Sequence, residues 1–245
     1  MLIPVSAVEK YWNVHPGKTV HVGAHEAEEL IEYEKFGWGP VIWIEAQPEK
    51  YQALKNRPIS ANHRFINAAV WDVSGVNLEL KVMTNSQSTS LFDLSTHSTE
   101  YPDIRLDHIV RVTTQTLNDL IPDNETPDLI ALDIQGAELK ALQGFGSRLN
   151  NVKWIYCEVN RRELYKGCCL VDEIDSYLAN YGFTRVATRW TRSGWGDALY
   201  SVSDQTPVQN LKQYLTWHIC QWDWYTREFI GLTLHRIKSS LKARI

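Results

Sequence analysis

The segment 128–139 limits what this chain can fold into more than any other part of the sequence. It reads Asp128-Leu-Ile-Ala-Leu-Asp133-Ile-Gln-Gly136-Ala-Glu138-Leu, so a short apolar run ends at a carboxylate. A glycine follows three residues later, and a helical pattern then begins. A short apolar run bounded by a turn is typical of a buried strand. Because open α/β sheets bind ligands at the C-terminal edge of their strands, the segment predicts a ligand site around Asp133.

The residues before this segment alternate between strand and helix patterns. Three β-prone runs predict strands over 18–23, 41–45 and 64–70, and two helical patterns between them cover 26–36 and 48–56. This β-α-β-α-β order is the repeating unit of a doubly wound parallel sheet, so we expect an α/β fold.

The remaining strands and one long loop complete the predicted domain. Apolar or alternating runs predict strands over 77–82, 108–113, 153–158, 183–190 and 197–202, the last two as an antiparallel pair, and a helix over 170–181. A polar, serine-rich loop spans 84–107. Ordered loops of this length are often lids or binding loops.

The character of the sequence changes after Pro207, where apolar residues recur at helical spacing from Leu211 to Leu232. We therefore expect a domain over 1–204 and a C-terminal helical extension over 205–245. From residue 226 onward the sequence contains five Lys or Arg residues and one acidic residue. Packing on the sheet or in a homodimer is the expected use of this helix, and peripheral contact with a membrane surface is the alternative.

Composition narrows the class of protein. The net charge of −4 over 245 residues argues against a nucleic-acid-binding polycation, so no nucleic-acid partner is expected. No apolar run approaches the ~18 residues of a membrane span, and the first residues lack the pattern of a leader peptide. We expect a cytoplasmic protein with reduced thiols, because the four cysteines form no disulfide or zinc pattern.

The turn after the first predicted strand, at Gly23, favours an adenosine-type ligand. A glycine lets a ligand approach the backbone closely, but the Gly-x-Gly-x-x-Gly pattern of dinucleotide-binding folds is absent. Glu26, Glu28 and Glu29 follow, and they would repel a pyrophosphate but tolerate a cationic sulfonium. Glu45 ends the second strand about twenty residues later, where an acid can accept hydrogen bonds from ribose hydroxyls. Taken separately, the two features would also fit a plain turn and a solvated acid.

Three motifs resemble the FkbM family of methyltransferases. They are Val22-Gly-Ala-His25, Glu45-Ala-Gln-Pro48 and, most specific, Asp133-Ile-Gln-Gly-Ala-Glu138. Weaker similarity extends to Asn67-Ala-Ala-Val-Trp-Asp72, Ser88-Thr-Ser-Leu91, residues 112–120 and Gly196-Asp-Ala-Leu-Tyr200, so it covers roughly residues 18–203. Two positions depart from the family: Gln135 replaces the usual acid, and Ala27 stands where a second glycine is often found.

The resemblance implies a Rossmann-like class I methyltransferase fold with a mostly parallel seven-stranded sheet and an antiparallel last strand. It implies S-adenosylmethionine as the methyl donor and O-methylation of a hydroxyl on a sugar, glycan or related natural product. The residues that it assigns to the cofactor are Gly23, Ala24, His25, Glu45, Ala46, Asn67, Ala68 and Asp133.

Removing the proton of the acceptor hydroxyl is the remaining chemical task. Asp133 and Glu158 end strands that are sheet neighbours in the expected order, and both are candidate catalytic residues. With Asn160 they would also form an all-oxygen site suited to Mg²⁺. The alternative is structural, with Asp133 capping the next helix and Glu138 stabilised in its first turn.

The candidate acceptor-binding residues are Ser88, Ser90, Gln135 and Trp195, and His25 is a further candidate. They lie at strand ends or in the long loop, where aromatic faces can stack on sugar rings. Two other functions stay open at this point: a cofactor-binding pseudo-enzyme and an NAD-linked oxidoreductase, the second disfavoured by the missing glycines.

Overall fold

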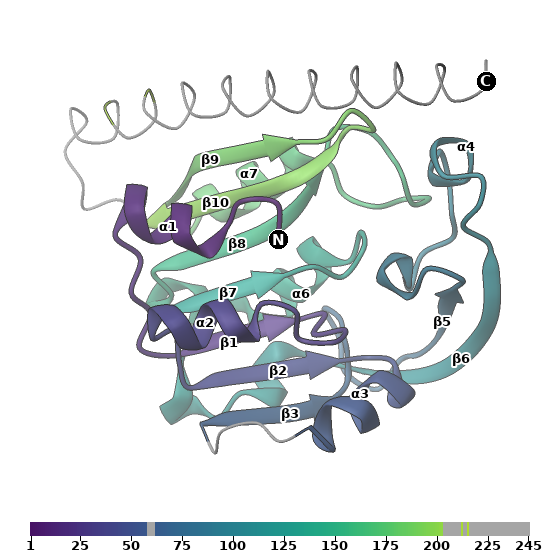
Figure 1. The fold of residues 1–245 in the computed structure, drawn as a ribbon, viewed down its shortest axis with the longest axis horizontal. Helices are drawn as coiled ribbons and strands as arrows, with labels where there is room; N and C mark the ends of the chain where they lie inside the picture. The colour runs from purple at the N-terminus through teal and green to yellow at the C-terminus, as the bar shows by residue number, and fades with distance from the viewer. Residues whose placement is uncertain (58–61, 203–211, 213–214, 216–245) are drawn as a thin grey trace, which may run out of the picture. The chain divides into compact units, whose positions relative to one another are not determined.

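A seven-stranded sheet forms the centre of the computed structural model, which describes residues 1–57 and 62–202 together with Lys212 and Leu215 (Figure 1). Its strand order is β3-β2-β1-β7-β8-β10-β9. The strands are β1 (Thr19–Val22), β2 (Val41–Glu45), β3 (His63–Asn67), β7 (Leu129–Leu132), β8 (Trp154–Asn160), β9 (Phe183–Trp190) and β10 (Trp195–Val202). Only β10 runs antiparallel to its neighbours in this sheet. The predicted α/β, Rossmann-like sheet with an antiparallel final strand is therefore confirmed.

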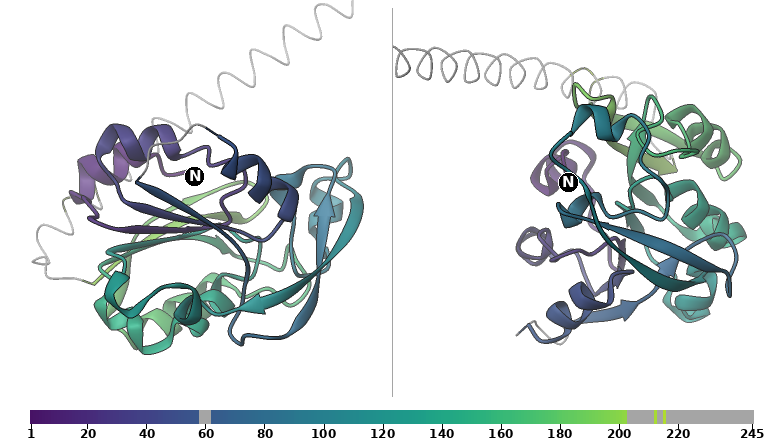
Figure 2. Two further views of the ribbon diagram at one scale, coloured as in Figure 1. Left: turned by 90° about the horizontal axis from the view of Figure 1, so that it is seen from below. Right: turned by 90° about the vertical axis from the view of Figure 1, so that its right-hand side faces the viewer.

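Helices cover both faces of this sheet, which explains why its central strands are apolar throughout. Every residue of β1 and of β7 is buried, as expected for parallel strands between two helical layers. In Figure 2 the purple and blue helices lie on one face and the green helices on the other. The first group is α1 (Val5–Trp12), α2 (Leu30–Phe36) and α3 (Pro48–Lys55), and the second includes α6 (Glu138–Phe145) and α7 (Val171–Ala179).

The two faces are packed differently. Aliphatic side chains of β1, β7 and β8 meet Ala141, Leu142 and Phe145 of α6 and Ile174 and Leu178 of α7 in the main core. On the other face, Trp43 stacks on both His21 and Tyr33, with ring centroids 4.8 and 5.5 Å away. Both layers hold the central strands rigidly, so the strand ends are fixed points for a site.

A second, three-stranded sheet with the order β4-β6-β5 corrects the sequence prediction. Its strands are β4 (Ala69–Val70), β5 (Asn77–Met83) and β6 (Leu106–Gln115). The predicted single strand over 64–70 is divided, because the chain leaves the main sheet after Asn67 and Ala69 and Val70 pair with Thr114 and Gln115. Residue 68 is the point where the chain changes sheets, and no residue pattern marks it.

The helix predicted from residue 26 begins only at Leu30, a second correction. His25 and Ala27 have φ values of 46° and 52°, in the left-handed region that an α-helix cannot contain. The segment between them is a tight turn at the edge of the sheet. The prediction missed it because acidic residues suit a first helical turn as well as they suit a turn of this kind.

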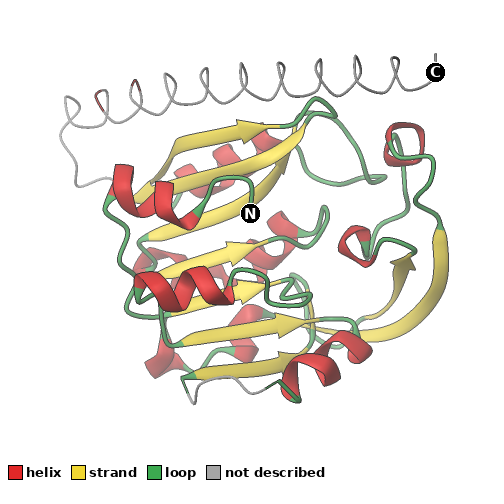
Figure 3. Ribbon diagram, in the orientation of Figure 1, coloured by secondary structure: helices red, strands yellow, loops and turns green. Residues whose placement is uncertain are grey.

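The polar loop predicted over 84–107 is ordered and carries two short helical elements, η1 (Ser86–Ser88) and α4 (His97–Glu100). Isolated bridges join Ser90 to Lys81 of β5 and Leu94 to Tyr165. In Figure 3 this loop and the small sheet lie beside the ends of the main strands. The other short elements are α5 (Leu117–Leu120), η2 (Asp123–Glu125) and η3 (Gly146–Asn151).

The predicted C-terminal helical extension lies outside the described residues, apart from Lys212 and Leu215, and stays a prediction. Among the residues that the structure describes, no helix combines the length and the apolar character that a membrane crossing requires.

Gly144 offers a test of how closely α6 packs on the segment that follows β4. A Cβ atom at this position would lie 2.2 Å from the carbonyl oxygen of Trp71. Helix propensity alone would make Gly144→Ala stabilising by about 1 kcal/mol. Overpacking against backbone costs about 1–3 kcal/mol, so we expect a net loss of unfolding free energy in urea denaturation. The exposed neighbour Gln143→Ala is the matched control, and a stabilised Gly144→Ala would contradict the contact.

Candidate active site

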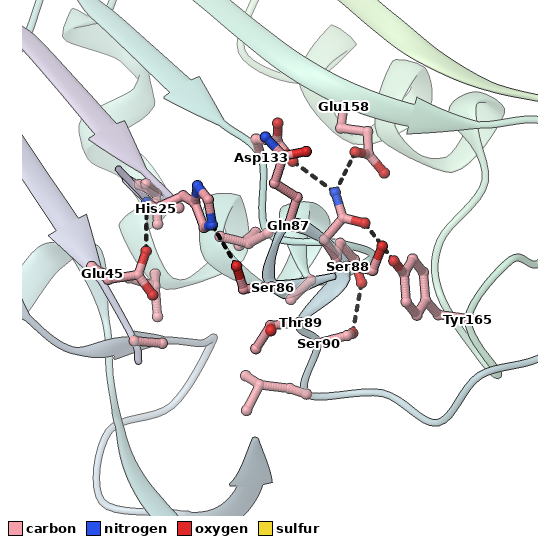
Figure 4. Close-up of a pocket in the computed structure, with 18 of the residues that line it drawn as sticks. His25, Glu45, Ser86, Gln87, Ser88, Thr89, Ser90, Asp133, Glu158 and Tyr165 are labelled. Carbon is pink, nitrogen blue, oxygen red and sulfur yellow. Dashed lines mark hydrogen bonds between the residues drawn. The ribbon is translucent and has the colours of Figure 1, made fainter. Parts of the chain in front are cut away.

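A cavity of about 430 Å³ lies at the C-terminal ends of the main-sheet strands. Residues after β1, β2 and β7 line it together with Glu158 of β8, Trp195 and Asp197 of β10, and the loop that carries η1 and α4. Its volume is within the range of about 300–1,000 Å³ that is usual for small-molecule sites. Figure 4 shows the part of this cavity between His25 and Tyr165.

Gly23 allows the ends of three strands to approach one another. Its φ is +86°, and a Cβ atom there would lie 1.9 Å from the backbone oxygen of Asp133. The amide nitrogens of Gly23 and Ala24 donate to the carbonyl of Ile44 at 2.9 and 3.0 Å. Only glycine fits a position with this φ and this contact, so Gly23 lets the chain after β1 lie directly against the backbone of Asp133 at the edge of the cavity.

Glu45 is held at the end of β2 by backbone donors. Its two carboxylate oxygens accept from the amides of His25 and Gln47, each at 2.7 Å. Burial raises the pKa of this carboxyl above its usual value, while the two backbone hydrogen bonds act in the opposite direction. Each oxygen keeps a lone pair for a further donor, so Glu45 can still receive hydroxyl groups of a ligand.

His25 ties the turn after β1 to the long loop. Its Nδ1 lies 2.6 Å from Glu28 Oε1, and its Nε2 lies 2.8 Å from the hydroxyl of Ser86 (Figure 4). Gln87 also donates to Glu28 Oε1, at 3.3 Å. These contacts hold η1 against the turn, so the loop forms a wall of the cavity.

Carboxyl groups of three adjacent strands converge on the opposite side. In the parallel pairing of β7 with β8, Leu132 lies beside Cys157, which brings Asp133 next to Glu158. Asp197 pairs with Glu158 from β10. Burial and the negative charge of Asp133 raise the pKa of Glu158 well above its usual range. Burial likewise raises the pKa of Asp197 to about 6. Glu158 therefore takes up a proton more readily than an ordinary carboxyl, and it lies beside the exposed side chain of Asp133.

Gln135 joins these carboxyl groups to the rest of the cavity. Its Nε2 donates to Asp133 Oδ1 at 2.8 Å and to Glu158 Oε2 at 2.7 Å, and its Oε1 accepts from the hydroxyl of Tyr165 (Figure 4). Its backbone oxygen accepts from Ser90 Oγ at 2.7 Å. The φ of Gln135 is 54°, a conformation that costs a non-glycine residue about 1–2 kcal/mol, and these contacts stabilise it.

Glu138 fixes the turn that carries Gln135. Its side chain is fully buried and accepts from the amides of Ile134 and Gly136 at 3.0 Å. Burial raises the pKa of this carboxyl to about 7. The helix α6 begins after Ala137 without any side-chain cap, so the structure does not give Asp133 the alternative role of helix cap.

The arrangement does not fit a Mg²⁺ ion held by Asp133, Glu158 and Asn160. The amide nitrogen of Gln135 lies between the first two carboxyl groups and donates to both, and the raised pKa of Glu158 makes its carboxyl a poorer cation ligand. Asn160 is buried and is not among the residues that line the cavity. Within the described ranges, no group of three or more His, Cys, Asp or Glu side chains is placed to hold a metal ion.

Most residues predicted for the site line one cavity. Those that do are Gly23, His25, Glu45, Ala46, Ala68, Ser88, Ser90, Asp133, Gln135, Glu158 and Trp195, whereas Ala24, Asn67 and Asn160 do not. The side chain of Asn67 instead donates to the backbone oxygens of Glu45 and Ala46. Sequence reasoning missed His97, Tyr101 and Tyr165, because only the tertiary pairing of Leu94 with Tyr165 brings their segments to the cavity.

Acidic side chains dominate the charge of the cavity, and the N-terminal ammonium of Met1, which lies 2.8 Å from Glu29 Oε1, is a positive group in its lining. Six carboxyl side chains line it, and no lysine or arginine side chain does so among the described residues. The carboxyl groups are Glu28, Glu29, Glu45, Asp133, Glu158 and Asp197. Such a cavity favours a cationic or neutral ligand and disfavours phosphates.

Comparison with known proteins is consistent with this geometry. The family model of the methyltransferase FkbM domain matches residues 21–185. The 2-O-methyltransferase NoeI of Sinorhizobium fredii (strain NBRC 101917 / NGR234) is 32% identical over 135 residues, which are 54% of this chain and 49% of that protein. The chain thus matches about half the length of this relative.

Solved structures show lower similarity. The ribosomal protein L11 methylase from Lactobacillus delbrueckii subsp. bulgaricus has a TM-score of 0.45 and 14% identity, covering 81% of this chain and 76% of that one. The magnesium protoporphyrin IX methyltransferase ChlM from Synechocystis PCC 6803, solved with bound SAM, has a TM-score of 0.44 and 10% identity, covering 81% and 77%.

Glu138 should make the protein less stable as the pH rises. The pKa of its carboxyl is about 7 in the folded protein, against 4.5 as the usual value. The folded state therefore holds a proton that the unfolded chain releases. This stabilisation is complete below about pH 4.5 and is lost as the pH passes 7; it amounts to about 3 kcal/mol at 1.36 kcal/mol per pH unit.

Urea unfolding from pH 4.5 to 8 measures this effect. The wild type should lose stability relative to Glu138→Gln over this range, because the variant has no proton to release. Glu79→Gln, which removes an exposed carboxyl on β5, should follow the wild type. Parallel curves for the wild type and Glu138→Gln would exclude the role given to Glu138.

Proposed function

Because this chain belongs to the FkbM family of methyltransferases, we propose that it transfers a methyl group from S-adenosylmethionine to a hydroxyl of a saccharide or related natural product. The observation that carries the proposal is the cavity, in which six carboxyl groups and no lysine or arginine line the described wall. A sulfonium cation and a neutral acceptor suit these charges, whereas the phosphates of NAD or of a nucleic acid would be repelled. The 2-O-methyltransferase activity in the name of the relative from Sinorhizobium fredii supports oxygen as the acceptor atom.

The cofactor half of the site comprises Gly23, Glu45, Ala46 and Ala68. Gly23 lines the cavity without a side chain, which fits a ligand that lies across the strand ends, and Glu45 keeps lone pairs for ribose hydroxyls. Bound there, S-adenosylmethionine would supply an electrophilic methyl group. The carboxyl groups around the turn would offset the positive charge of its sulfur.

The acceptor half comprises Asp133, Gln135 and Glu158. With S-adenosylmethionine bound, the acceptor oxygen would take the methyl group, and the electron pair of the carbon–sulfur bond would stay on the sulfur. Asp133 receives the proton of the hydroxyl as general base. Gln135, fixed by Tyr165 and Ser90, keeps the carboxylate of Asp133 oriented. No step uses a divalent cation, because Gln135 Nε2 bridges the two carboxyl groups.

The cellular location of the protein and its oligomeric state are predicted from the sequence alone. A cytoplasmic location is part of the proposal, and contact with a second copy or with a membrane surface through the C-terminal residues stays a prediction.

Calorimetry with S-adenosylmethionine and its demethylated product tests the cofactor half. We expect both to bind, and Glu45→Gln to weaken both about tenfold, because hydrogen bonds to a charged acceptor are lost. Glu79→Gln is the control for loss of an exposed carboxyl. If the wild type bound neither compound, the proposal would fail. Binding without methyl transfer to any hydroxyl acceptor would identify a pseudo-enzyme instead.

Asp133→Asn tests the general base. Transfer of labelled methyl onto a panel of glycosides should fall roughly 10²- to 10⁴-fold, because an amide cannot take the proton. The variant keeps an oxygen for Gln135 to donate to, so cofactor affinity should change little. Turnover equal to that of the wild type would remove Asp133 from the mechanism.

Gln135→Glu tests the bridge. The change replaces the donor between Asp133 and Glu158 with a third carboxyl, which gives an oxygen cluster suited to a hard cation. We expect calorimetry with Mg²⁺ to detect tighter binding by Gln135→Glu than by the wild type. Wild-type methyl transfer should be unchanged by EDTA, and a loss of activity in EDTA would contradict the absence of a metal-dependent step.

A further inference from the structure

One wall of the cavity is built from aromatic side chains whose contacts form a continuous series. His97 lies between two tyrosines, with ring centroids 5.0 Å from Tyr101 and 5.3 Å from Tyr165. The indole nitrogen of Trp195 donates to the hydroxyl of Tyr101 at 2.9 Å. All four side chains line the cavity, and we call them the aromatic wall.

The aromatic wall is joined directly to the acceptor half of the site. The hydroxyl of Tyr165 donates to Gln135, whose amide nitrogen contacts both Asp133 and Glu158. Trp195 lies on β10 two residues before Asp197, which pairs with Glu158. A ring held against this wall would therefore lie next to the carboxyl groups and away from the cofactor residues near Glu45.

His97 has an unused hydrogen-bonding atom. The residue is only 4% exposed, and its Nδ1 has no partner among the described residues. Thr89, which also lines the cavity, has a buried Oγ1 in the same state. Buried polar atoms are normally paired. Thr19, Trp38 and Asn160 also hold unpaired buried atoms, but among the described residues only His97 and Thr89 of this group line the cavity.

The wall is also uncharged. Burial lowers the pKa of His97 below its usual value, so its imidazole is neutral at pH 7 and can donate from one nitrogen while accepting at the other. The carboxyl group of Asp133, joined to the wall through Gln135, would repel an anion. An aromatic face beside several neutral hydrogen-bonding groups matches a ring with apolar C–H faces and hydroxyl edges.

The segments that carry the wall are fixed to each other. The amides of Ser95 and His97 donate to the carbonyl of Leu164 at 2.8 and 3.2 Å. Arg162 Nη2 lies 2.7 Å from Glu100 Oε1. These contacts hold the short helix α4 in place, so the wall is ordered before any ligand arrives.

We propose that the aromatic wall is the acceptor subsite, that it stacks on the face of a neutral pyranose ring, and that His97 hydrogen-bonds to a ring hydroxyl. The proposal rests on the function proposed above, because it names the class of acceptor that the site takes. It adds His97, Tyr101 and Tyr165 as residues that determine specificity.

The test measures binding of methyl glycosides of neutral pyranoses to the full chain saturated with the demethylated cofactor product, by ligand-observed NMR. We expect saturation transfer to the ring C–H protons of one face. Matched uronic acids and catechol should bind at least about tenfold more weakly. Preferred binding of either class, or no binding of any pyranoside by a chain that binds the cofactor product, would overturn this proposal and leave methyl transfer intact.

Variants assign the interaction to residues. His97→Phe keeps a ring but removes the nitrogen atoms, and should weaken pyranoside binding about tenfold. His97→Gln should recover part of it, and His15→Phe, at an exposed histidine, should change nothing. Trp195→Phe should bind better than Trp195→Ala. Affinity for the cofactor product, measured in parallel, should be unchanged throughout.

Two results would decide against the assignment. Equal pyranoside binding by His97→Phe and the wild type would exclude His97. If His97→Phe does not fold, His97→Gln and Trp195→Phe carry the test, and wild-type affinity in Trp195→Ala would exclude stacking on this wall. Failure of the cofactor product to bind the wild type would instead contradict the proposed function itself.

Discussion

The candidate site depends on relieving the repulsion between carboxyl groups on three neighbouring strands. Asp133, Glu158 and Asp197 lie side by side because β7, β8 and β10 are adjacent. The raised pKa of Glu158 favours the neutral form of that carboxyl, and the amide nitrogen of Gln135 gives the first two carboxyl groups a shared donor. Gln135 reaches this place only through a left-handed backbone conformation, which the buried Glu138 and the hydroxyls of Ser90 and Tyr165 stabilise.

Much of the main sheet could be predicted because its signals are local. Apolar runs that end at Glu45, Asp133 and Glu158 identify strands, and parallel order then brings their ends to one edge. The division of the third predicted strand after Asn67 was missed. It depends on pairing with β6, which is distant in the sequence and therefore leaves no local signal. The left-handed turn at His25 and Ala27 was missed for a similar reason, since tertiary contacts outweigh the helical preference of the acidic residues.

The site was predictable where strand ends supply it and unpredictable where loops do. Gly23, Glu45 and Asp133 follow from their positions along the chain. The role of Gln135 was only half visible: its departure from the family pattern marked the position, but not the fact that the amide would bridge two acids. His97 and Tyr101 gave no signal, because a histidine and a tyrosine in a polar loop reveal nothing about a partner more than sixty residues away.

The backbone pairing between Leu94 and Tyr165 has a consequence for how such a protein can diversify. Each segment supplies side chains to the same wall, and each depends on the other for its conformation. A change in the length of one loop would displace the residues carried by the other, although the cofactor residues on the main sheet would stay where they are. A change of acceptor, in evolution or in design, therefore requires both loops to be replaced together as one unit, while the cofactor half is kept.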